Sequence, residues 1–289
     1  MDIRSVLGCA TLDLERQGFS TPKLDAEVLL SHCLRKDRSF FYAHPETQLT
    51  EEEIQRFQES ISRRLGGEPI AYIVGQKEFW SLPFEVNNHV LIPRPETELL
   101  IETILRIYAA KDSGNLMILE IGTGSGVISV ALASELKNAH IVATDISFEA
   151  LSVAARNARK NGVEHRISFL RGSLFETVSE KFDIIVTNPP YVPEGEFNLL
   201  PWGIRGFEPK LALIAGMEGI AFHKDIIRQG AYYLRERGRL FVEMGADQKE
   251  RIIELFKESF LYEDVAFIRD YVGLDRVFTA KRRKEIING

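Results

Sequence analysis

The sequence predicts an α/β fold with a mainly parallel sheet, preceded by a small domain made of helices. From residue 116 onward, buried strand patterns alternate with helix patterns, which is typical of a parallel sheet covered by helices. Residues 1–75 show helical periodicity alone. Between these parts, aromatic and β-branched runs surround turn residues, which favours a β-hairpin. We therefore predict a helical domain at 1–75, a β-hairpin linker at 76–93 and an α/β domain at 94–289.

The helical domain is predicted to contain three main helices. The first has its apolar residues on one face and can end at Gly18. The second occupies 21–34, where Thr21 is a cap and the proline after it suits the first turn. The third begins at Thr50, which forms a capping box with Glu53. The domain has 9 Lys+Arg and 12 Asp+Glu, and this acidity argues against DNA recognition.

The α/β domain is predicted to begin with a helix that has Pro95 in its first turn and glutamates near its positive end. The strands are expected at "LMILEIG", "HIVATD", "RISFL", "FDIIVTN", "RLFVEMG", "DVAFIRD" and "RVFTAKR". The helices between them are expected at 126–137, 147–161, 218–236 and 247–260. The longest segment without periodicity is 192–217, and a loop of that length in a compact domain usually serves function.

The composition is that of an ordinary soluble globular protein. The 289 residues are 45% hydrophobic and 27% charged, with a net charge of −6 that gives no help to non-specific nucleic-acid binding. No direct DNA binding is therefore expected. The chain lacks a run of about 18 apolar residues and a signal-peptide pattern, so a cytoplasmic protein without a membrane span is expected, as a monomer. Cys9, Cys33 and the six histidines lack metal-ligand spacing, so no metal is expected.

A glycine-rich loop, "LEIGTGSGV", ends the first strand of the α/β domain. Gly122, Gly124 and Gly126 allow a tight turn and the approach of a ligand to the main chain. Val127 stands where a dinucleotide-binding loop has its last glycine, so a dinucleotide is disfavoured. Asp145 ends the next strand, 19 residues after Gly126, and can accept both hydroxyls of a ribose. These residues predict a nucleoside cofactor without a pyrophosphate, which S-adenosylmethionine fits; alternatively they only tighten a turn and cap a helix.

The motif "TNPPYV" follows the strand "FDIIV", at the same sheet edge as the glycine loop. Pro189 and Pro190 have no N–H and a fixed φ, so their carbonyls point in a preset direction. Asn188 adds a side-chain acceptor, and two fixed acceptors suit the planar NH2 group of an amide or aryl amine. Tyr191 can pack on the substrate or face a sulfonium. The alternative for this motif is a stiff turn in solvent.

Five motifs are distributed over nearly the whole chain: "EFWSLPFEVNNHVLIPRPETELL", "LEIGTGSGVISVALA", "TNPPYVP", "GFEPKLALIAGMEG" and "VGLDRV". Together they resemble one family, the HemK/PrmC release factor glutamine methyltransferases. It implies a seven-stranded, Rossmann-like S-adenosylmethionine-dependent methyltransferase domain and a helical domain that docks release factors. It also implies methylation of the glutamine amide nitrogen in the Gly-Gly-Gln motif of these factors, with S-adenosylhomocysteine as product and a role in translation termination.

The site residues implied by the resemblance follow from the motifs. The cofactor-binding residues are Gly122, Thr123, Gly124, Ser125, Gly126, Asp145, Ser173, Leu174 and Asn188. The catalytic residues are Asn188, Pro189, Pro190 and Tyr191, and the same residues with Arg94 bind the substrate. At 172–175 the chain departs from many relatives, which have an acidic residue before an aromatic one. The adenine contact is then expected from Ser173, a backbone group or water.

Two segments near the expected site have alternative interpretations. Arg94 lies close to the positive end of a helix, which predicts a partner such as an acidic side chain or the cofactor carboxylate. The segment 93–98 can also be a plain start of a helix. The segment 203–209, "GIRGFEP", is either a lid over the site or an ordinary surface loop.

Other functions share part of this pattern. A nucleic-acid (adenine-N6) amino methyltransferase uses the same acceptor chemistry but needs a basic recognition domain, whereas residues 1–75 are acidic. Ribosomal protein L3 glutamine methyltransferases share the NPPY motif but usually differ from "IPRPETE". A binding protein that only kept the fold is disfavoured, because binding alone does not need the acceptor pair.

Overall fold

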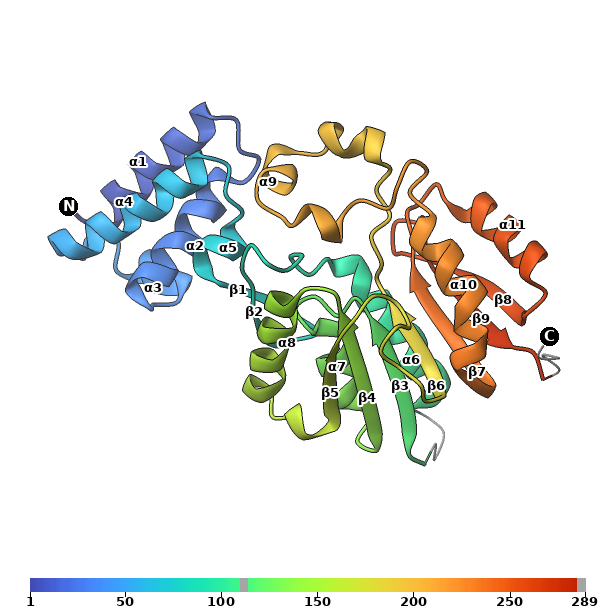
Figure 1. The fold of residues 1–289 in the computed structure, drawn as a ribbon. Coiled ribbons are helices and arrows are strands. Elements are labelled where there is room, and N and C mark those ends of the chain that lie inside the picture. The colour runs from blue at the N-terminus through green and yellow to red at the C-terminus, as the bar shows by residue number, and fades with distance from the viewer. Residues whose placement is uncertain (110–113, 285–289) are drawn as a thin grey trace. The chain divides into compact units, whose positions relative to one another are not determined.

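The computed structural model divides by its internal contacts into two compact units, which we treat separately (Figure 1). The helical unit comprises residues 1–76 together with the short segment 201–207. The sheet unit comprises 77–200 and the chain from 208 onward. The segment 201–207 thus lies within the range predicted for the α/β domain but belongs by its contacts to the helical unit. The residues that the structure describes are 1–109 and 114–284.

The helical unit is built on a core of apolar side chains from its longer helices. Its helices are α1 (Ile3–Arg16), α2 (Pro22–Leu34), α3 (Arg38–Ala43), α4 (Glu51–Leu65), α5 (Ile70–Val74) and α9 (Trp202–Arg205). Ile3, Leu14 and Leu29 are fully buried in this core. The sequence analysis missed α3 and α5, because helices of 6 and 5 residues are too short to show a period. The indole of Trp202 donates to the carbonyl of Gly66 at 3.0 Å.

The two predicted helix caps differ in outcome. Thr50 Oγ1 accepts from the Glu53 N–H at 3.2 Å, and the Glu53 carboxylate accepts from the Thr50 N–H at 2.8 Å. The capping box is therefore confirmed. Thr21 occupies the cap position of α2 but makes no capping bond; its hydroxyl instead donates to Asp25 Oδ1 at 2.8 Å. Asp25 is buried and also accepts from Arg64 at 2.8 Å.

The sheet unit contains a seven-stranded sheet in the order β5-β4-β3-β6-β7-β9-β8. The strands are β3 (Leu116–Ile121), β4 (Ala139–Asp145), β5 (Ile167–Arg171), β6 (Phe182–Thr187), β7 (Leu234–Glu243), β8 (Tyr262–Arg269) and β9 (Asp275–Arg282). Only the pairs that involve β9 are antiparallel. The predicted α/β fold with a seven-stranded, mainly parallel sheet is confirmed.

Helices cover both faces of this sheet. They are α6 (Glu98–Tyr108), α7 (Val127–Glu135), α8 (Phe148–Lys160), α10 (Ala221–Tyr233) and α11 (Lys249–Ser259). Successive residues of β3 point to opposite faces: Ile118 lies in the core formed with α6 and α7, and Leu119 in the core formed with α10 and α11. The helix predicted at 218–236 is too long, because β7 already begins at Leu234.

The predicted β-hairpin is present as β1 (Gln76–Phe79) and β2 (Leu82–Glu85). Its turn residues Trp80 and Ser81 both have positive φ, as a tight two-residue hairpin turn requires. Short 3₁₀ turns complete the chain at η1 (Pro95–Thr97), η2 (Glu164–Arg166), η3 (Glu194–Leu199) and η4 (Lys210–Ala212). Pro95 therefore opens a 3₁₀ turn before α6 rather than the α-helix itself. In the part of the chain that the structure describes, no helix is long and apolar enough to cross a bilayer.

Candidate active site

A cavity of about 310 Å³ opens where β3, β4, β5 and β6 end. All of its lining residues belong to the sheet unit. The predicted site residues that line it are Arg94, Gly122, Thr123, Gly124, Ser125, Asp145, Ser173, Leu174, Asn188, Pro189 and Pro190. Gly126 and Tyr191 are not among its lining residues. The sheet thus brings together most residues that the sequence analysis singled out.

The glycine loop turns through three residues with positive φ, a region that side chains rarely adopt. Gly122 and Gly124 have φ of +70° and +54°, and a Cβ at either would meet no atom within 4 Å. The backbone at these two glycines therefore borders open space in the cavity, where a ligand can approach it. Gly126 has φ of +83°, and a Cβ there would lie 3.0 Å from the Cβ of Ala154. A glycine at this position therefore allows α8 to pack closely against the loop.

Asp145 is fixed at the end of β4 by the main chain. Its Oδ2 accepts from the Gly124 N–H at 2.8 Å, and its Oδ1 accepts from the Ser147 N–H at 2.9 Å. Burial raises the pKa of Asp145, while these backbone bonds act in the opposite direction. The carboxylate is thereby presented at the cavity wall in a set orientation, with acceptor capacity left for hydroxyl donors.

Glu120 is a second carboxylate at the cavity, and the sequence analysis missed it. Its Oε2 accepts from the Thr123 hydroxyl at 2.8 Å, from the Ser129 N–H at 3.0 Å and from the Ser129 hydroxyl. It is 1% exposed, and burial raises its pKa to about 7. The sequence contains a signal for this role, an acidic residue inside the apolar run "LMILEIG". Burying a carboxylate costs free energy, so a glutamate in a buried strand indicates a functional or a paired group.

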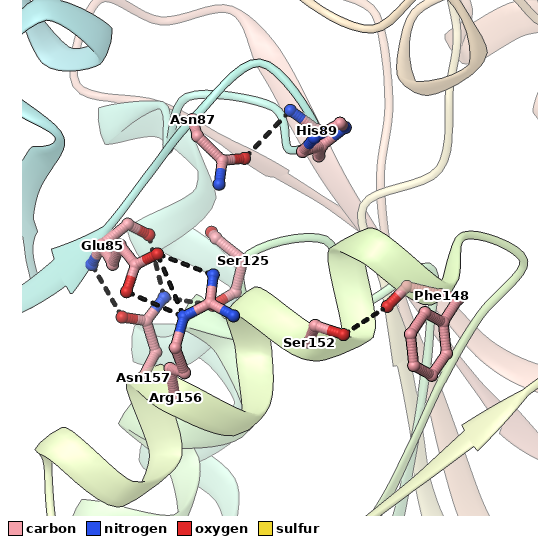
Figure 2. A network of polar contacts seen from close by, with 8 residues as sticks. All are labelled: Glu85, Asn87, His89, Ser125, Phe148, Ser152, Arg156 and Asn157. Carbon is pink, nitrogen blue, oxygen red and sulfur yellow. Dashed lines mark hydrogen bonds and ion pairs between the residues drawn. The ribbon is translucent and has the colours of Figure 1, made fainter.

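Asn157 on α8 holds the glycine loop to the hairpin (Figure 2). Its Oδ1 accepts from the Glu85 N–H at 2.7 Å. Its Nδ2 donates to the Glu85 carbonyl at 3.0 Å and to the Ser125 carbonyl at 2.8 Å. Asn157 is fully buried, so these bonds are formed away from competing water. Figure 2 also shows Arg156 beside it, paired with the Glu85 carboxylate at 2.6 Å.

The segment after β5 forms part of the cavity wall. Ser173 and Leu174 both line the cavity. The Ser173 N–H donates to Glu176 Oε2 at 3.1 Å, and Leu174 has φ of +48°. A left-handed backbone at a leucine is uncommon and indicates that the turn is held by its surroundings.

Asn188 reaches the cavity from the end of β6 and is held by two buried residues. Its Nδ2 donates to Thr97 Oγ1 at 3.0 Å, and Thr97 Oγ1 donates to Glu243 Oε2 at 2.7 Å. Thr97 comes from η1 and Glu243 from the end of β7. Sequence reasoning missed this role for both residues, since 146 positions separate them and neither stands in a local pattern that points to the other.

Tyr191 lies in a different environment from the three residues before it. Burial raises the pKa of its hydroxyl, and the nearby Glu243 carboxylate adds to this shift. Its backbone carbonyl accepts from Gln248 Nε2 at 2.9 Å. Because Tyr191 does not line the cavity, the structure brings together Asn188, Pro189 and Pro190 there without it.

Arg94 has an acidic partner in the sheet unit. Its Nη2 lies 2.5 Å from Glu208 Oε1, and Glu208 Oε2 accepts from the Ile92 N–H at 3.1 Å. The Glu208 side chain is 1% exposed, so the pair is largely shielded from water. One of the two partners expected for Arg94, an acidic side chain, is therefore present.

The chain matches known families along most of its length. Residues 5–75 match the family described as PrmC N-terminal domain, and residues 95–200 match the methyltransferase small domain. The chain is 40% identical over 279 residues to a release factor glutamine methyltransferase of Aliivibrio fischeri, with 96% of each chain covered. It is 35% identical to a bifunctional methyltransferase of Rickettsia conorii, covering 95% of this chain and 57% of that protein.

Solved structures agree with the fold. The catalytic domain of hMettl16, in complex with the MAT2A 3′UTR hairpin 1, superposes with a TM-score of 0.59. The match covers 89% of this chain and 92% of that one at 14% identity, so it shows a common fold alone.

Replacing Asn157 by alanine should disturb both stability and the glycine loop. The change leaves two carbonyls and one N–H without partners in a buried place, which should cost about 2–4 kcal/mol of unfolding free energy. The Ser125 carbonyl also loses its anchor, so affinity for the cofactor predicted from the sequence, S-adenosylmethionine, should fall. Denaturant unfolding and calorimetric titration measure the two effects.

The matched control is Asn161→Ala at the C-cap of the same helix. Asn161 Nδ2 donates to the Pro83 carbonyl at 3.2 Å and to the Asn157 carbonyl at 2.9 Å, with no bond to the glycine loop. It should lower stability less and leave cofactor affinity unchanged. Equal losses of affinity in both variants would contradict a specific role for Asn157.

Proposed function

The chain belongs to the release factor glutamine methyltransferase family, and on that basis we propose that it methylates the glutamine amide nitrogen of the Gly-Gly-Gln motif in peptide chain release factors. One observation carries the proposal. The glycine loop, Asp145 and the Asn188–Pro190 segment surround a single cavity, in a chain 40% identical to an enzyme named for this reaction. The enzyme would thereby act on the machinery of translation termination.

We propose S-adenosylmethionine as the methyl donor, because the donor and acceptor set of the cavity fits it. Asp145 offers an anchored carboxylate for the ribose hydroxyls, and Gly122 and Gly124 leave room for a ligand against the backbone. Glu120 offers a carboxylate that suits an ammonium group. Ser173 and Leu174 form the wall expected to lie against adenine, where Ser173 offers a hydroxyl.

The residues after β6 are proposed to position the substrate nitrogen. When bound, S-adenosylmethionine supplies a sulfonium methyl group, and transfer forms an N–C bond, breaks the S–C bond, leaves a thioether and releases one proton from nitrogen. Asn188 Oδ1 and the Pro189 carbonyl would accept the two N–H groups of the glutamine amide. These N–H groups become more acidic as the nitrogen attacks, so both bonds strengthen toward the transition state. The chain thus contributes orientation more than a strong base.

The helical unit is proposed to dock the release factor. It is a compact unit with its own core and matches the PrmC N-terminal domain. All residues that line the cavity belong to the sheet unit. The sheet unit can therefore bind the cofactor and the reacting amide, while the helical unit selects the protein that carries the amide.

The substrate is tested by direct transfer of label. The protein is mixed with methyl-labelled S-adenosylmethionine and, separately, with a release factor, its variant with alanine for the motif glutamine, ribosomal protein L3 and DNA. Label should enter the release factor alone and should be absent from the alanine variant. Label in DNA or L3, with none in the release factor, would refute the proposed substrate.

Asn188→Ala should separate binding from turnover. The substitution removes one preorganised acceptor, so kcat should fall by about 10²–10³-fold. Affinity for S-adenosylmethionine should change much less, because Gly124, Asp145 and Glu120 are untouched. Single-turnover methylation of the release factor and calorimetric titration of the cofactor measure the two. Undiminished turnover would rule out the two-acceptor mechanism.

A further inference from the structure

The buried contacts of Asn188 determine which end of its amide faces the cavity. Thr97 is 2% exposed and Glu243 is 1% exposed, so water does not compete for either group. Asn188 lines the cavity and Glu243 does not. The pairing of β6 with β7 places Thr187 opposite Val242, so Asn188 and Glu243 are the next residues along these neighbouring strands. Thr97 joins the two side chains.

The direction of the bonds follows from the number of hydrogens. An ionised carboxylate can only accept, and the Thr97 hydroxyl has one hydrogen. That hydrogen is donated to Glu243, so Thr97 can only accept from its other neighbour. Asn188 must then direct its NH2 group to Thr97, as the structure shows. The Oδ1 atom is the end of the amide that remains for a ligand.

We propose that Glu243 is a positioning residue that acts through Thr97 to keep the carbonyl oxygen of Asn188 toward the substrate. The inference rests on the proposed function, because this orientation matters for a substrate that donates N–H groups. An amide turned the other way would oppose its own NH2 to the NH2 of the glutamine. Two donors facing each other cannot form a hydrogen bond, so the wrong orientation is unproductive.

The ionisation state of Glu243 determines whether the Asn188 amide can adopt the reversed orientation, with its NH2 group toward the substrate. A protonated Glu243 can donate to Thr97, and the Thr97 hydrogen is then free to be donated to Asn188 Oδ1. The Asn188 amide can turn over without leaving a buried group unpaired. An ionised Glu243 excludes that arrangement, because it needs the Thr97 hydrogen for itself.

The charged and titratable groups around Glu243 leave it as the group that changes charge near neutral pH. Burial raises its pKa to about 7. The bond from Thr97 opposes the shift, Glu96 adds to it, and the charge of Arg276 and, least of all, the nearby Asn188 amide oppose it. His223 contacts the Glu243 backbone carbonyl at 3.0 Å, and burial lowers its pKa to about 4, so it is neutral there. Burial of the nearby Tyr191 raises its pKa further and keeps it neutral.

The pH profile of turnover tests the inference without any substitution. At saturating cofactor and release factor, kcat should rise as the pH increases through about 7, because Glu243 becomes ionised. Glu120 has a similar pKa, so the same profile is measured for Glu243→Gln. The rise should disappear in that variant, since its amide does not titrate. If kcat of Glu243→Gln still rises with pH as it does in the parent protein, the rise is due to another group and the proposed role of Glu243 is wrong.

Substitutions at Thr97 test the connection itself. Thr97→Val keeps the shape but removes the hydroxyl, and kcat should fall by about 10–100-fold with little change in cofactor affinity. Thr97→Ser restores a hydroxyl and should recover most of the lost turnover. The matched control is Thr103→Val, which removes a buried hydroxyl that donates to the Leu99 carbonyl at 2.6 Å, and it should keep parental kcat. Equal turnover in Thr97→Val and Thr103→Val would refute the inference.

A spectroscopic measurement separates this inference from the proposed function. The side-chain NH2 signals of Asn188, in ¹⁵N-asparagine-labelled protein and identified by their absence in Asn188→Ala, should shift with pH near 7. The shift should be absent in Glu243→Gln. This readout needs no substrate, so failure of release factor methylation would refute the proposed function alone. Signals that do not respond to pH in the parent protein would refute the link between Glu243 and Asn188, whatever the substrate proves to be.

Discussion

Parallel pairing of neighbouring strands is the constraint on which the whole site depends. Strands that run the same way end at the same edge of the sheet, so the residues after them become neighbours. The register pairs Ile121 of β3 with Thr144 of β4 and with Thr187 of β6. The glycine loop, Asp145 and Asn188 follow these positions directly. A slip of one residue in this register would point different side chains at the cavity and separate them.

Two buried carboxylates at this edge of the sheet are stabilised by the same kind of partner, a hydroxyl group that donates a hydrogen bond. Glu120 and Glu243 are each 1% exposed, and burial raises the pKa of both to about 7. Within residues 1–109 and 114–284, neither forms an ion pair; hydroxyl donors from Thr123 and Ser129, or from Thr97, satisfy them instead. A carboxylate satisfied by hydroxyls keeps its charge available for another donor, whereas a close cation would neutralise it. A charge that is not neutralised by a close cation can act on a bound ligand, either directly at the cavity, as for Glu120, or through neighbouring side chains, as for Glu243.

The sequence predicted what depends on local pattern. The glycine loop, the acid after the next strand and the asparagine before two prolines each stand in a short contiguous motif that follows an apolar strand. The strand pattern alone then places them at one edge of the sheet. Ser173 was assigned through resemblance, and its position at the cavity wall agrees with that assignment.

The remainder of the site depends on contacts between distant residues. Asn157 joins Ser125 to Glu85 through three bonds, one of them to Ser125, yet in sequence it is one polar residue in an amphipathic helix and is indistinguishable from Asn161. Thr97 and Glu243 meet only because η1 lies beside the end of β7 in the folded unit. Tyr191 is the last residue of the NPPY motif, but unlike Asn188, Pro189 and Pro190 it does not line the cavity, and its role with the substrate stays a prediction. The 3₁₀ turn η1 that carries Thr97 is too short to show a hydrophobic period.

The segment "IPRPETE" looks in sequence like a plain start of a helix, but in the structure its polar side chains have specific partners in other parts of the sheet unit. Arg94 pairs with Glu208, which joins this segment to "GFEP" and so connects two distant motifs through one partly buried ion pair. Thr97 joins Asn188 to Glu243. Glu98 accepts from the Trp80 N–H at 2.8 Å and ties the segment to the hairpin. Each polar side chain thus reaches a different element of the sheet unit, and the 3₁₀ turn opened by a proline sets the spacing between them. Helix propensity alone would allow many other residues at these positions, whereas three simultaneous partners allow few, so the segment carries more information about the fold than a plain start of a helix would.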